Sequence, residues 1–142
     1  MTISVGDGRI VSNGGVYRLF FVGRINTKLF KEIMTVLTDE VILTEKQIEH
    51  IKERHPRDYE RYAAHIPEIL STPDYILEAN KPNSLVLLKK FSSDDGRFQL
   101  ILRLKSSADD VGFSNSVITF MKIEEKRYLR YLRAKKILYK RE

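Results

Sequence analysis

The chain of 142 residues contains no cysteine, which excludes disulfide scaffolds, thiolate metal sites, iron–sulfur clusters and a cysteine nucleophile. Long apolar runs are also missing, since none approaches the roughly 20 residues that a membrane-spanning helix needs. The first six residues have no basic start and no apolar stretch, so we expect no signal peptide. These absences favour a soluble protein that folds in a reducing cytoplasm.

Acidic residues are outnumbered by basic ones, with 19 Asp and Glu against 25 Lys and Arg and a net charge of +6. Residues 124–142 alone carry eight basic and three acidic side chains, so most of the excess lies at the C-terminal end. A basic end of this kind suits a polyanion such as nucleic acid or anionic lipid. The alternative is a solvated helical face that only keeps the protein soluble.

Residues 1–38 are predicted to form a β-rich extension, either separate or part of the same domain. Asn13-Gly14-Gly15 is a hairpin signal between two β-rich runs, and a strand is expected over 16–25. A short helix is expected within 26–37, where apolar residues recur at helical spacing. We place the boundary near Thr38, so that residues 39–142 form the main domain.

The main domain is predicted to be α+β, with N-terminal helices packed on an antiparallel sheet of about four strands. The segment Thr44–Gln47 has the spacing of a capping box, so a helix begins at Glu45; Pro56 ends it near Arg54. A second helical piece covers 67–70. Further along we expect strands over 75–79, 85–91, 98–105 and 116–123, a basic helix over 124–135 and an edge strand over 137–139.

Three polar residues form a stripe on the helix that begins at Glu45. Gln47, His50 and Arg54 are three and four positions apart, so they lie on one side of the helix. Arg54 offers a planar fork for phosphate, and His50 can move a proton near neutral pH. His55 continues the buried face of this helix, so it is expected to orient such a site from behind. The alternative is a boundary stripe in water, with His55 as a buried residue.

The strand over 98–105 has one apolar and one polar face. Alternation places Arg103 and Lys105 on the face opposite Phe98, Leu100 and Leu102. A sheet with one face packed on a helix leaves the other as a polar platform. Cations, hydroxyls and a histidine around such a platform could cleave RNA without a metal, through attack of the ribose 2′-OH on the phosphate. A solvated strand is the alternative.

Several segments together resemble a known family. They are His50–Pro56, Ile66–Leu70, Pro73–Leu77, Leu102–Lys105 and Ser116–Phe120. This set is similar to the phage-borne branch of the barnase–EndoU–colicin–RelE-like nucleases, over about residue 41 to the C-terminus.

The resemblance implies a helix-plus-antiparallel-sheet ribonuclease (barnase- or RelE-like), with metal-independent cleavage and no cofactor. It implies a toxin module of a phage or mobile element, with a possible cognate immunity protein or antitoxin, acting in its own or a target cell's cytoplasm. The catalytic positions that it implies are His50, Arg54 and His55 on the helix with Arg103, Ser116 and Thr119 on the sheet. From charge and spacing, we expect RNA to be bound by Gln47, Lys105, Lys126, Arg130 and Arg133.

Other classes of site fit the sequence less well. The three histidines lack the His-Glu-x-x-His pattern of a zinc site. Pro73-Asp74 suggests a metal nuclease, but Glu78 and Lys81 are one residue too far apart for that motif. The main alternative to an enzyme is a basic RNA- or protein-binding module on a nuclease-like fold. Tyrosines among its basic residues would then stack with the bases of RNA. The sequence therefore predicts a metal-independent, toxin-like endoribonuclease that binds RNA and no membrane.

Overall fold

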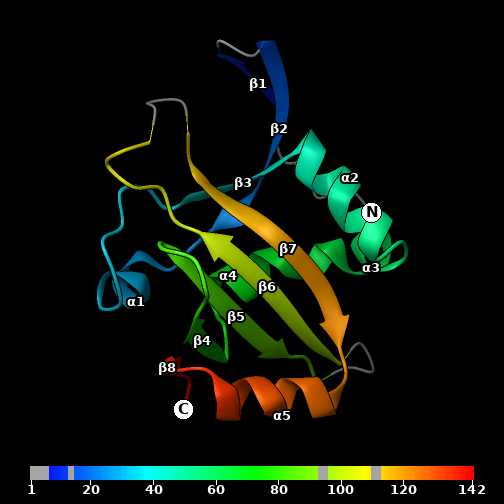
Figure 1. Cartoon of the computed structure of the whole chain (residues 1–142), viewed down its shortest axis with the longest axis vertical. Helices are drawn as coiled ribbons and strands as arrows, with labels where there is room; N and C mark the ends of the chain where they lie inside the picture. Colours follow the sequence, from blue (N-terminus) through cyan, green and yellow to red (C-terminus); the bar gives the residue numbers. More distant parts are fainter. Residues whose placement is uncertain (1–6, 13–14, 93–95, 110–112) are drawn as a thin grey trace.

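The computed structural model describes residues 7–12, 15–92, 96–109 and 113–142 (Figure 1). The predicted turn at 13–15 therefore lies largely outside the described residues. The elements are β1 (Asp7–Ser12), β2 (Gly15–Arg24), α1 (Thr27–Lys31), β3 (Glu40–Thr44), α2 (Glu45–Arg54), α3 (Asp58–Tyr62), a 3₁₀ turn (Ala63–His65), α4 (Ile66–Ser71), β4 (Tyr75–Glu78), β5 (Ser84–Lys90), β6 (Arg97–Arg103), β7 (Asn115–Ile123), α5 (Glu125–Ala134) and β8 (Ile137–Lys140).

The strands of the described part form one sheet in the order β1-β2-β3-β7-β6-β5-β4-β8. The predicted antiparallel meander is confirmed as β4 to β7. The prediction of about four strands is wrong, because β3 pairs parallel with β7 and brings β1 and β2 into the same sheet, while β8 pairs with β4. The parallel junction rests on only two residue pairs, between partners more than seventy positions apart. The local sequence pattern does not predict a pairing between residues so far apart in the chain.

Helices α2, α3 and α4 lie between β3 and the meander, whereas α1 precedes β3 and α5 follows β7, so the helices are not gathered at the N-terminal end of the domain. Helix α2 has the predicted bounds, and the Thr44 hydroxyl caps it by accepting a hydrogen bond of 3.1 Å from the Gln47 N–H. Helix α1 is shorter than predicted and ends at Lys31, while α3 was not expected. Helix α3 has five residues and no side-chain cap, so it lacks the usual start signal. Within the described ranges, no helix is long and apolar enough to cross a membrane.

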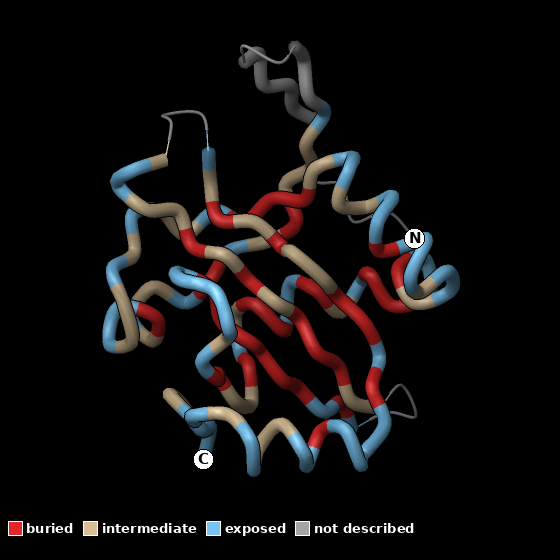
Figure 2. Tube along the Cα trace, in the orientation of Figure 1, coloured by how far each residue is buried: buried red, intermediate tan, exposed pale blue. Residues whose placement is uncertain are grey.

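Two apolar cores lie on opposite faces of the sheet. Alternate residues of β5 show this, since Leu85 and Leu87 belong to one core while Val86 and Leu88 belong to the other. The first core contains buried residues of α2, α3 and α4, so these helices cover one face; in Figure 1, α4 passes behind β6 and β7 while α2 and α3 lie to the right of β7. The second core contains Tyr128 of α5, which crosses the lower end of the other face. Figure 2 shows the buried positions concentrated in the central strands and α5 mostly exposed.

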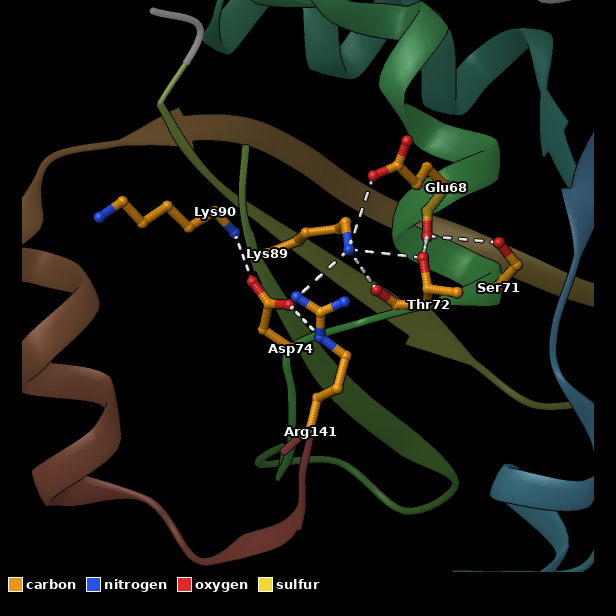
Figure 3. Close-up of polar contacts among 7 residues, drawn as sticks. All are labelled: Glu68, Ser71, Thr72, Asp74, Lys89, Lys90 and Arg141. Atoms are coloured by element: carbon orange, nitrogen blue, oxygen red, sulfur yellow. Dashed lines mark hydrogen bonds and ion pairs between the residues drawn. The ribbon is translucent and has the colours of Figure 1, made fainter. Parts of the chain in front are cut away.

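A cluster of ion pairs around a buried lysine holds the residues that follow β8 against the sheet. The Lys89 cluster consists of Glu68, Thr72, Asp74, Lys89 and Arg141 (Figure 3). The Lys89 side chain is 4% exposed, and its ammonium donates to the Thr72 carbonyl at 2.6 Å and lies 3.7 Å from the Asp74 carboxylate. The same carboxylate lies 3.0 Å from the Arg141 guanidinium, just beyond β8. The cluster therefore joins α4, β4, β5 and the end of the chain.

Candidate active site

The sheet face that α5 only partly covers holds a pocket of about 680 Å³. Its floor is apolar and consists of Val86, Ile101 and Ile118 from three neighbouring strands. Its walls are formed by the β4–β5 loop, the end of β6 and the C-terminal end of α5. The polar side chains among its lining residues are Asn80, Lys81, Asn83, Ser84, Arg103, Tyr131 and Lys135. We call this the open-face pocket.

The β4–β5 loop forms one wall through two fixed contacts. Asn83 adopts the left-handed backbone conformation with φ 60°, which asparagine tolerates better than most residues. Its carbonyl accepts a hydrogen bond of 2.8 Å from the Leu104 N–H, so the loop is attached to the end of β6. On the other side, the Lys135 ammonium donates to the Asn80 side-chain oxygen at 3.0 Å. Helix α5 and the loop are thus joined across the pocket.

Arg103 enters the pocket with a fixed orientation. Two of its guanidinium nitrogens donate to the two carboxylate oxygens of Asp109, at 2.9 and 3.1 Å. Asp109 is held in turn by the Ser106 N–H, which donates to it at 2.8 Å. A guanidinium has five N–H donors, so three remain for a ligand. Sequence reasoning missed Asp109, although a serine three residues before an aspartate, just after a strand, is a signal for such a turn.

The ion pair between Arg103 and Asp109 leads to a testable prediction about the protonation of Asp109. Hydrogen bonding from Arg103 lowers the pKa of Asp109 to about 2 from its ordinary 3.8. Because the pKa of Asp109 is lower in the folded than in the unfolded protein, the ion pair stabilises the fold fully at pH values above 3.8. This stabilisation is lost as the pH falls through about 2. We expect the carboxyl carbon signal of Asp109 to titrate near pH 2 in the native protein and at a higher pH in Arg103→Ala, where only the hydrogen bonds from Ser106 still lower the pKa of Asp109. Equal midpoints in the two proteins would contradict the pairing.

A β-bulge places two hydroxyl residues on the same face as Arg103. Ser116 pairs directly with Arg103, and Thr119 pairs with Ile101. The register shifts between these pairs, which leaves Ile118 as the extra residue of β7. Directly paired residues point to the same face of a sheet, so the predicted sheet residues Arg103, Ser116 and Thr119 do lie together. Lys105 follows them into the loop, where its N–H donates to the Asn115 side chain at 2.8 Å.

The predicted helix residues lie on the other side of the sheet. Ile51 of α2 is buried in the core that also contains Leu102 and Val117. Arg103 and Ser116 are the sequence neighbours of those two strand residues and point the opposite way. The structure therefore does not assemble the helix and sheet residues into one site.

The stripe itself has the predicted direction on α2. His50 and Arg54 are exposed, and Gln47 is half-buried beside them. His55 is also half-buried and ends the helix, where its N–H donates to the Ile51 carbonyl at 2.7 Å. The roles assigned to these residues stay predictions.

Helix α5 presents its basic residues to solvent. Lys126, Arg130 and Arg133 are all exposed, as helical spacing predicts. The residues of α5 that line the pocket, Tyr131 and Lys135, were not among the predicted site residues. Only the fold brings them against β6, since no local pattern relates the end of α5 to the β4–β5 loop.

Searches of the curated proteins and of the solved structures find no match. A family model described as phage-Barnase-EndoU-ColicinE5/D-RelE like nuclease2 matches residues 22–140. This range runs from the end of β2 through β8, so it includes the open-face pocket and the stripe on α2. The chain belongs to the family of phage-Barnase-EndoU-ColicinE5/D-RelE like nucleases.

Proposed function

We propose that this protein is a metal-independent, toxin-like endoribonuclease that cleaves RNA in the open-face pocket. The observation that carries the proposal is the convergence of three cations, Lys81, Arg103 and Lys135, on one pocket with an apolar floor. Clustered cations suit a phosphate diester, and an apolar floor suits the face of a base. A cognate immunity protein or antitoxin would inhibit the enzyme by covering this pocket.

The chemistry that fits these residues is an internal transesterification. The ribose 2′ oxygen attacks phosphorus and loses its proton, the bond to the 5′ oxygen breaks, and that oxygen takes up a proton. Negative charge grows on the non-bridging oxygens in between, and Arg103 with the two lysines would stabilise it. Ser116 and Thr119 share this face of the sheet with Arg103 but do not line the pocket, so they would donate hydrogen bonds only to a phosphate oxygen that lies beyond it. Of the described residues that line the pocket, Lys81, Tyr131 and Lys135 can exchange a proton.

Incubation of the purified protein with RNA in EDTA tests the function directly. Fragments with 2′,3′-cyclic phosphate ends would support metal-independent transesterification. Loss of cleavage in EDTA with recovery in Mg²⁺ would contradict metal independence. Tight, salt-sensitive binding with no cleavage would instead favour the alternative of a basic RNA-binding module on a nuclease-like fold.

A substitution at His50 tests whether RNA is cleaved in the open-face pocket or at the stripe on α2. Because the sheet lies between His50 and Arg103, we expect His50→Ala to keep RNA cleavage within about twofold of the native rate, well short of the loss of a general acid or base. Initial rates on a fluorogenic oligoribonucleotide measure this. A loss of about 10²–10⁴-fold, in a protein with native melting temperature, would move the proposed chemistry to Gln47, His50 and Arg54.

A further inference from the structure

A second, smaller cavity continues the open-face pocket along α5. It has a volume of about 180 Å³ and is lined by Arg127, Arg130, Tyr131, Ala134 and Lys135. Tyr131 and Lys135 also line the open-face pocket, so the two cavities share a wall. From Arg127 to Lys135, which directly follows the helix, is eight steps along the chain, or roughly 12 Å along the axis of α5. We call this surface the α5 flank.

The two arginines of the α5 flank differ in position from the other basic residues of the helix. Tyr128 is buried against the sheet, which fixes the rotation of α5. Arg127 and Arg130 line the smaller cavity, which shares Tyr131 and Lys135 with the open-face pocket. Lys126 and Arg133 are equally exposed, but they line neither cavity. The helix therefore carries two pairs of cations, one beside the pocket and one away from it.

Arg127 and Tyr131 form a platform on the α5 flank. The guanidinium carbon of Arg127 lies 5.7 Å from the centroid of the Tyr131 ring, and one of its nitrogens donates to the Tyr131 hydroxyl at 3.5 Å. A guanidinium against an aromatic ring offers a planar surface that carries positive charge. Nucleic acid bases stack on such surfaces whatever their sequence, while cations nearby contact the backbone.

We propose that the α5 flank is a subsite for RNA that extends beyond the nucleotide in the open-face pocket. Arg127 and Arg130 bind phosphates of the adjoining backbone, and a neighbouring base stacks against Tyr131. The proposal rests on the proposed function, because it places the scissile nucleotide in the open-face pocket. The smallest ligand that contacts both the open-face pocket and the α5 flank is then a short oligonucleotide, rather than a single nucleotide or a dinucleotide.

The test compares two double variants that remove the same charge from the same helix. The flank variant is Arg127→Ala with Arg130→Ala, and the matched control is Lys126→Ala with Arg133→Ala. All four side chains are exposed, so both variants are expected to fold, which thermal melting checks. The probe is a labelled 12-nucleotide RNA with 2′-O-methyl groups, which lacks the attacking hydroxyl and cannot be cleaved. Fluorescence anisotropy over a series of salt concentrations measures its affinity.

The two variants should differ in the salt dependence of binding. Loss of two phosphate contacts from single-stranded RNA should reduce the slope of log K against log salt by roughly 1.4 in the flank variant, and by much less in the control. A labelled dinucleotide should bind both variants equally. Equal slopes in the two variants would overturn the subsite. Because the probe is not cleaved, a protein that never cleaves RNA but shows this difference would contradict the nuclease proposal and keep the subsite.

Discussion

Arg103→Ala is expected to lower kcat/KM for RNA cleavage by about 10²–10³-fold, the usual effect of removing one donor to an oxyanion that forms in the transition state. Arg103 is the cation of the open-face pocket with the most fixed geometry, because Asp109 holds two of its nitrogens and leaves three donors for phosphate. Single-turnover cleavage of a short RNA measures the effect, with circular dichroism to confirm folding.

Two further variants separate charge from geometry at this position. Arg103→Lys keeps the charge but loses the planar fork, so it should recover little of the activity. Asp109→Asn leaves Arg103 in place but weakens its orientation, so a smaller loss is expected, seen in kcat more than in KM. Arg133→Ala serves as control, since it removes an exposed positive charge that does not line the pocket. Full activity of Arg103→Ala would remove Arg103 from the chemistry.

Local patterns predicted the elements that have local causes. Helix α2 has the expected ends because a capping hydroxyl at Thr44 and the backbone restriction before Pro56 both act within a few residues. The β4–β7 meander was predicted for the same reason, since each strand pairs with the next along the chain. The pairing of β3 with β7 was missed, because the side chains of these two strands do not specify a partner more than seventy positions away.

The candidate site was predicted only in part, and for a comparable reason. Strand alternation placed Arg103 on the face opposite Leu102, and the structure puts Ser116 and Thr119 there as well. The expected polar platform is wrong, because this face also carries the second apolar core. Helical periodicity gave the direction of His50 relative to its own helix axis, but periodicity cannot tell which face of the sheet that helix will cover. The burial of Ile51 in the core that also contains Leu102 and Val117 decides this, and it separates the two halves of the expected site.

The largest effect on stability is expected from the Lys89 cluster. Asp74→Ala should reduce the free energy of unfolding by roughly 3 kcal/mol, because it removes the less exposed of the two carboxylates that face the buried Lys89 ammonium. The value is at the low end for a broken buried pair, since the Thr72 carbonyl and the Glu68 carboxylate still contact Lys89. Asp74 is 14% exposed, so water replaces little of what is lost. Urea unfolding followed by tyrosine fluorescence measures the change.

A double variant shows whether the loss comes from the charge left on Lys89. Asp74→Ala with Lys89→Met removes both buried charges and keeps most of the lysine volume, so it should be more stable than Asp74→Ala alone. Arg141→Gln is the matched control for the outer contact of Asp74. Arg141 is 53% exposed, so its ion pair should contribute less than about 1 kcal/mol. If the double variant were the least stable of the three, the stabilisation would come from the lysine's own contacts with α4, and Asp74 would serve mainly to hold the end of the chain through Arg141.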